Sequence, residues 1–128
     1  DVYTEVPADA WPADHLGAEP WAAAHERFAR ERRWEVFAFG ETGDQLRARV
    51  AGAVDELIAA HPGGTVAVVC HGGAINAYLG HVLGIAPDMF FLPAHASLTV
   101  VLAAADGRRA VECLNERHHL EAAGLLTY

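Results

Sequence analysis

A histidine followed by two glycines is the part of this sequence with the clearest chemical potential. His71-Gly72-Gly73 follows the apolar run 66–70 and precedes the helix-like stretch 74–83. A strand buried on both faces of a parallel sheet has such an apolar run, and ligands bind at the carboxyl ends of these strands. Glycines let a ligand approach the backbone, and the following helix N-terminus attracts anions. The pattern predicts that His71 and Gly72 line a site for an oxyanion or phosphoryl group.

The residue types around His71 are also compatible with two other interpretations. It could be a core histidine hydrogen-bonded to backbone, although its place between an apolar run and two glycines favours a functional role. It could also belong to an esterase oxyanion hole, which requires a serine nucleophile flanked by glycines. The only serine, Ser97, has no flanking glycine, so the esterase interpretation is discounted.

Two helices are expected around this motif. The segment 66–70 is predicted to be a buried strand, and the helix at 73–83 should end at Gly84. A longer amphipathic helix should begin near Thr42 or Asp44 and end at 61–64, where His-Pro-Gly-Gly stops it. Its apolar face is marked by residues at helical spacing: Leu46, Val50, Val54, Leu57 and Ile58.

The remaining chain predicts a hairpin and an aromatic segment. Strands at 96–103 and 110–114, joined by a turn at 105–108, are typical of a hairpin. Residues 7–39 contain three prolines and all three tryptophans, which indicates loops around a short helix near 22–33. The order αβαββ belongs to an α/β sandwich.

Four motifs in the segment 40–120 together resemble the histidine phosphatase superfamily, also called phosphoglycerate mutase-like. They are Gly40-Glu41-Thr42 before a helix, the segment 68–75 around His71-Gly72-Gly73, the strand 96–101, and 114–120 with its Asn-x-x-x-His-Leu pattern. The resemblance covers roughly two thirds of the chain in the family's order. It implies a three-layer α/β/α sandwich with a mostly parallel sheet, here with its N-terminal part absent.

The resemblance also implies a reaction. It is the hydrolysis of a phosphomonoester through a phosphohistidine, with neither a metal nor a cofactor. His71 would stabilise the transferring phosphoryl group, and Gly72 would bind phosphate. The segment 2–6 is similar to the family's Leu-x-Glu segment, so Glu5 would protonate the leaving group; Glu5 could equally be a solvated residue near the chain end.

The family's Arg-His-Gly motif and its second arginine are missing from the sequence. Arg117-His118 is followed by His119 rather than glycine. We therefore expect residues 1–128 to be the C-terminal portion of one domain, with 7–39 as a lid and 40–128 as its core. Two alternatives stay open: an inactive member that binds phosphate or a protein partner, and phosphoryl transfer of the mutase type. The mutase branch usually has His-Gly-Asn-Ser where this chain has His71-Gly72-Gly73-Ala74, which favours hydrolysis.

The amino-acid composition favours some classes of binding partner over others. The formal net charge of −8, with nine arginines as the only basic residues besides histidine, argues against nucleic-acid and anionic-membrane binding. A small phosphorylated substrate and a cytoplasmic location are expected, with Cys70 and Cys113 as unbridged thiols; a homodimer is compatible with the sequence. A metal-binding module using the eight histidines stays an alternative, although His95, His118, His119 and Cys70 match no zinc-ligand spacing.

Overall fold

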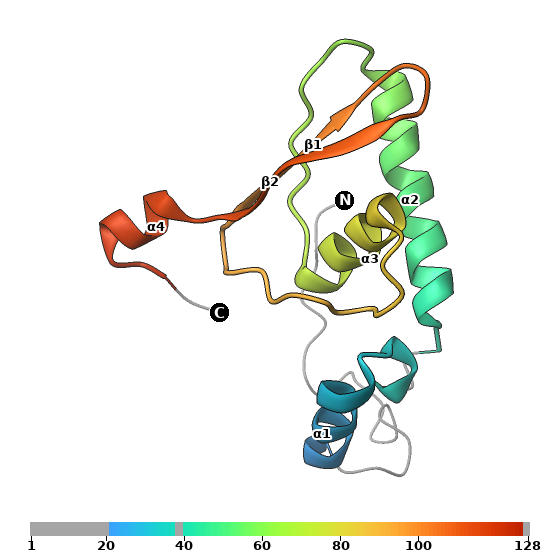
Figure 1. The fold of residues 1–128 in the computed structure, drawn as a ribbon, viewed down its shortest axis with the longest axis vertical. Coiled ribbons are helices and arrows are strands. Elements are labelled where there is room, and N and C mark those ends of the chain that lie inside the picture. Colours follow the sequence, from blue (N-terminus) through green and yellow to red (C-terminus); the bar gives the residue numbers. More distant parts are fainter. Residues whose placement is uncertain (1–20, 38–39, 127–128) are drawn as a thin grey trace, which may run out of the picture.

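The computed structural model describes residues 21–37 and 40–126. Along the chain the described elements are four α-helices, one short 3₁₀ helix and two strands (Figure 1). They are α1 (Trp21–Glu31), η2 (Trp34–Phe37), α2 (Gly43–Ala60), α3 (Gly72–Leu83), β1 (Leu98–Ala103), β2 (Arg109–Glu116) and α4 (His118–Ala123).

The centre of the described structure is the pair α2 and α3, which pack against each other. Their buried residues include Leu46 and Ala51 on α2 and Ala77 and Leu79 on α3. The Arg47 side chain of α2 passes close to Gly80 of α3, where a Cβ would lie 3.2 Å from the guanidinium nitrogen Nη2. The apolar spacing that predicted α2 thus places part of its apolar stripe against α3.

Local signals fix where α2 and α3 begin and end. Thr42 caps α2 through a capping box in which its hydroxyl accepts a hydrogen bond from Gln45 N and the Gln45 side chain accepts from Thr42 N. The helix ends at His61, as predicted. Gly84 ends α3 in the left-handed conformation, with φ of 67°. Because glycine has no Cβ, it adopts this conformation without the steric cost that other residues incur.

The prediction of a buried strand at 66–70 is wrong for this structure. Residues 64–71 form an extended segment without strand hydrogen bonding, which connects the end of α2 to the start of α3 (Figure 1). Its side chains are exposed rather than buried: Val68 is 52% and Val69 100% exposed. An extended segment becomes a buried parallel strand only when neighbouring strands bond to both of its edges. Within the described residues no strand does so.

The described sheet has two strands and is antiparallel. β1 pairs with β2, with Val101 opposite Val111 and Ala103 opposite Arg109. The predicted hairpin is confirmed, and its turn contains Gly107 at φ of 90°. The register shifts twice between Leu98 and Val101, where β2 has extra residues. The described residues therefore provide the α/β elements but not the three layers or the mostly parallel sheet that we expected.

The described part of the aromatic segment 7–39 is mostly helical. α1 and η2 pack together through Ala24 and Val36, with Phe28 against them. The predicted helix at 22–33 is confirmed with slightly different bounds, and η2 was not predicted. In Figure 1 these two elements lie below the start of α2. None of the helices within residues 21–37 and 40–126 is both long and apolar enough to cross a membrane.

Candidate functional site

His71 lies at the head of α3, as the sequence predicted. Its backbone is extended at φ of −105° and ψ of 163°, and its carbonyl accepts a hydrogen bond from Ile75 N at 3.0 Å. The residue is exposed, and its imidazole does not cap the helix. The first amide groups of a helix have no intrahelical acceptor, so they and the helix dipole favour an anion at this end. The position suits an imidazole that acts on a bound anion.

The two glycines after His71 allow close packing on their Cα atoms. A Cβ on Gly73 would lie 3.0 Å from Cη2 of Trp34, which is tighter than ordinary contact. A Cβ on Gly72 would meet Pro93 Cδ at 3.5 Å and Met89 Cε at 3.9 Å, which is ordinary van der Waals contact. Two apolar segments, one from η2 and one from the loop after α3, therefore border the His71-Gly72-Gly73 turn.

Asn76 fixes the loop after α3 against the first turn of that helix. The side chain is completely buried. Its Oδ1 accepts hydrogen bonds from Phe90 N at 3.0 Å and Phe91 N at 3.3 Å, and its Nδ2 donates to Gly72 O at 2.9 Å and Phe91 O at 3.1 Å. A buried amide with all of its groups bonded is a rigid connection. It holds the loop at the start of α3.

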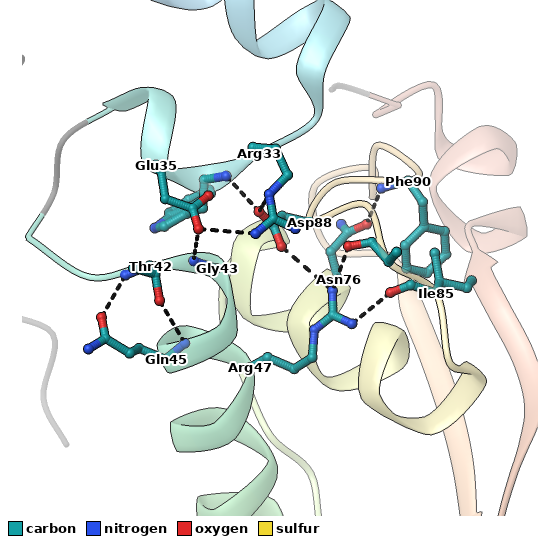
Figure 2. A network of polar contacts seen from close by, with 12 residues as sticks. Arg33, Glu35, Thr42, Gly43, Gln45, Arg47, Asn76, Ile85, Asp88 and Phe90 are labelled. Atoms are coloured by element: carbon teal, nitrogen blue, oxygen red, sulfur yellow. Dashed lines mark hydrogen bonds and ion pairs between the residues drawn. The ribbon is translucent and has the colours of Figure 1, made fainter.

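Asp88 connects η2, α2 and the loop after α3 (Figure 2). Its carboxylate is 4% exposed and accepts a hydrogen bond from Trp34 N at 2.6 Å. It also forms ion pairs with Arg33 at 3.8 Å and Arg47 at 3.6 Å. Arg47 in turn donates to Ile85 O at 2.7 Å. A buried carboxylate needs such compensation, because its desolvation is costly.

Glu35 extends the network of polar contacts around Asp88 to the start of α2. Glu35 Oε1 accepts hydrogen bonds from Gly43 N at 3.2 Å and Arg33 Nη2 at 3.1 Å. Its own backbone N–H and the N–H of Gly43 hold the pKa of Glu35 below its ordinary value, with Arg33 adding to the effect. The nearby Asp88 carboxylate raises the pKa of Arg33. The acidic and basic groups here are charged and bonded to one another.

The C-terminal motif 114–120 is hydrogen-bonded to the loop before β1. Asn115 Oδ1 accepts from Ala94 N at 2.9 Å, and Asn115 N donates to Thr99 Oγ1 at 3.1 Å. Asn115 has φ of 54°, which asparagine tolerates better than most residues. The His119 ring nitrogen Nε2 lies 3.1 Å from Ala96 O. The asparagine and the histidine of this motif thus have structural contacts here.

The structure describes only some of the other residues that the sequence analysis considered for a site. Glu5 lies outside the described residues, as do Trp11 and most of the aromatic segment's N-terminal half. Cys70, predicted to be buried, is exposed, and both cysteines are free thiols. Within the described ranges no three histidine, cysteine or acidic side chains form a group that could hold a metal. The described part of the site therefore consists of His71, Gly72 and Gly73 with the apolar segments beside them.

Sequence reasoning placed Trp34 near the site only as part of the lid at 7–39, and it missed Asn76 and Asp88 as neighbours of this turn. A signal for two of them existed: Asn76 is the single polar residue in the apolar start of α3, and Asp88 is the single acidic residue in the apolar segment 82–94. Buried polar residues of this kind are bonded. Their partners, however, lie far away in sequence and could not be named.

Most arginines already pair with a carboxylate within the described residues. Seven of the nine arginines in the sequence do so: Arg27, Arg33, Arg47, Arg49, Arg108, Arg109 and Arg117. A phosphoryl site needs charge-assisted hydrogen bonds, which arginine provides best. These seven side chains are committed to other partners.

Comparison with known proteins gives one match. The family model of the histidine phosphatase superfamily (branch 1) matches residues 12–117, which is most of the chain and includes His71, Gly72 and Gly73. Glu5 precedes the matched residues. No curated protein and no solved structure matches this chain.

Proposed function

This chain belongs to the histidine phosphatase superfamily, and we propose that it takes part in the hydrolysis of a phosphomonoester, with His71 stabilising the phosphoryl group during transfer. Membership supports phosphoryl-transfer chemistry in general. The observation that carries the finer proposal is the place of His71: an exposed imidazole at the head of the 12-residue helix α3, followed directly by Gly72 and Gly73.

The chemistry proposed for His71 is electrostatic. As the phosphoryl group leaves its oxygen, negative charge is spread over its three equatorial oxygens. An imidazole N–H of His71 would donate a hydrogen bond to one of them, while the Gly72 N–H at the start of α3 faces the same region. Donors held in place before the reaction stabilise the transition state without reorganisation. His71 and Gly72 would therefore act together.

The phosphorylated nucleophile is proposed to come from polypeptide outside these 128 residues. The sequence contains no Arg-His-Gly motif, and most of its arginines are paired elsewhere. The exposed extended segment 64–71 offers edges to which a strand carrying that motif could bond, which would complete the mostly parallel sheet and its three layers. Glu5, preceding the matched residues, keeps its proposed role as the general acid for the leaving group.

Replacement of His71 tests this proposal. In the full-length protein, His71→Ala should lower turnover of an artificial phosphomonoester by roughly 10²–10³, as for the loss of one preorganised donor. Folding should stay nearly intact because the side chain is exposed. The matched control is His81→Ala, since His81 is also an exposed histidine on α3 but lies in its last turn. Turnover of His71→Ala equal to that of the control contradicts the proposal.

One observation favours a second candidate, a family member that binds phosphate without turnover. It is the lack of the Arg-His-Gly motif in a chain that keeps the His71 turn. Such a protein would bind inorganic phosphate or a phosphorylated partner at the start of α3. Phosphate binding by the full-length protein, with no release of phosphate from any monoester, would favour this candidate over the enzyme.

A further inference from the structure

Trp34 is the largest side chain against the His71-Gly72-Gly73 turn. The far edge of its six-membered ring, at Cη2, Cζ3 and Cζ2, would lie 3.0, 3.4 and 3.6 Å from a Cβ on Gly73. The absence of a side chain at Gly73 therefore allows the indole to reach the backbone of the first turn of α3. Trp34 is only partly buried, so part of its surface is exposed to solvent.

The indole has a fixed orientation. Phe28 of α1 packs edge-on against it, with ring centroids 6.3 Å apart and an interplanar angle of 75°. Gly73 bounds its other end. An aromatic ring supported in this way presents a rigid apolar surface at low entropic cost to whatever binds beside it. The flat surface suits another flat apolar group.

The Asp88 carboxylate holds the backbone of Trp34 in place. The 2.6 Å hydrogen bond from Trp34 N to Asp88 Oδ2 joins the first residue of η2 to the loop after α3. That loop is itself held at the start of α3 by Asn76. Hence η2, the loop and the His71 turn form one connected unit, of which Figure 2 shows the contacts of Asp88 and Asn76.

We infer that Trp34 is a specificity-determining residue of the phosphoryl site, that it favours phosphomonoesters with an aryl leaving group, and that Asp88 is the residue that positions it. The inference rests on the proposed function. A phosphate at the start of α3 would place its leaving group beside the Gly73 end of the turn, where the indole offers apolar surface. An aryl group that covers this surface removes apolar area from water, whereas a glycerol group does not.

Kinetics on the full-length protein test the inference. Trp34→Ala should raise KM for phenyl phosphate by about five- to tenfold and change KM for glycerol phosphate by less than about twofold. Trp34→Phe should keep part of the aryl preference. Leu83→Ala, at the other end of α3 with a side chain that is 48% exposed, is the matched control and should alter neither. Equal KM changes for both substrates in Trp34→Ala overturn the inference.

Two substitutions test the role of Asp88. Asp88→Asn keeps an oxygen that accepts from Trp34 N, so the aryl preference should be retained. Asp88→Ala removes that acceptor and should reduce the preference as Trp34→Ala does, with kcat for glycerol phosphate much less affected. A loss of preference in Asp88→Asn as large as in Asp88→Ala would refute positioning by this hydrogen bond.

A binding measurement on the wild-type protein requires only one conservative variant, which serves to assign a signal. The full-length wild-type protein is titrated with phenylphosphonate and methylphosphonate, which are not hydrolysed, and the Trp34 indole N–H is followed by NMR, assigned from its loss in Trp34→Phe. Both ligands should shift the Gly72 amide signal, and only phenylphosphonate should shift the indole signal. Shifts at Gly72 without an indole shift overturn the inference and leave the proposed function standing. No shift at Gly72 with either ligand overturns both.

Discussion

The carboxylate of Asp88 occupies the space in which a side chain on Gly43 would lie. Gly43 is the first residue of α2, and Asp88 belongs to the loop after α3. The two segments approach so closely that only a glycine fits at the start of α2 without displacing a buried carboxylate. This contact, with the hydrogen bond from Trp34 N, brings three segments together beside the His71 turn.

The contact predicts opposite effects for two glycines of the same helix. Gly43→Ala should destabilise the full-length protein by about 1–3 kcal/mol, because the added methyl group forces Asp88 away from its partners. Gly52→Ala is the matched variant: a Cβ there meets no atom within 4 Å, and alanine in a helix interior should gain about 0.5–1 kcal/mol. Denaturant unfolding measures both. If Gly43→Ala leaves the free energy of unfolding unchanged, the Asp88 carboxylate can move aside at no cost in stability, which contradicts the prediction.

A second prediction concerns the buried amide of Asn76. Asn76→Ala should lower the free energy of unfolding by about 3 kcal/mol, since the Phe90 and Phe91 groups that it bonds lose their partner in a buried place. Glu56→Gln, on the exposed face of α2, is the control and should stay within about 0.5 kcal/mol of the wild type. Urea or guanidinium denaturation of the full-length protein checks this. A loss below about 1 kcal/mol would show that the loop finds other partners.

A third prediction is that residues 1–128 by themselves release no phosphate. The sequence contains no residue that we can place as the phosphorylated nucleophile, and a phosphoryl site without the two motif arginines of the family lacks its main charge-assisted bonds. The purified chain, given a generic phosphomonoester, should release phosphate no faster than buffer, with an active phosphatase as the positive control. Activity that disappears on replacing His118 or His119 would place the nucleophile in the C-terminal motif.

A fourth prediction concerns acid stability through Glu41. Two hydrogen bonds of 2.8 Å from the Arg49 guanidinium hold the pKa of Glu41 below its ordinary value of 4.5. Since the folded-state pKa is the lower one, the stabilisation is present above about pH 4.5 and is lost as the pH falls through the folded value. The Arg49 side chain is 64% exposed, so solvent screening limits the effect to about 0.5 kcal/mol.

Glu41→Gln isolates this contribution. Its free energy of unfolding should be about 0.5 kcal/mol below that of the wild type near neutral pH, and the difference should be smaller at pH 3. The control is Glu56→Gln, because Glu56 is an exposed glutamate on α2 that has no ion pair among the described residues. A difference between Glu41→Gln and wild type that is the same at both pH values would rule out the ion pair as its source.

The sequence by itself determined the local elements and the position of His71. α2 follows from apolar residues at helical spacing, and α3 follows from the helix-like stretch between Gly73 and Gly84. Their ends follow from Thr42 with Gln45 and from Gly84. The hairpin follows from two β-rich runs around a turn with Gly107. Each of these depends on residues a few positions apart, because helical bonds and caps join near neighbours. His71 is at the head of α3 for the same reason.

Only the tertiary structure decided what surrounds His71. Trp34 N and Asp88 are 54 residues apart, and Phe90 lies 14 residues from the Asn76 side chain that binds its N–H. No periodicity encodes such contacts, since they depend on how the helices pack. The predicted strand 66–70 is the converse case: its residues have the composition of a buried strand, yet Val69 is fully exposed. Strand formation depends on hydrogen-bonding partners elsewhere in the polypeptide, whereas a helix bonds to itself.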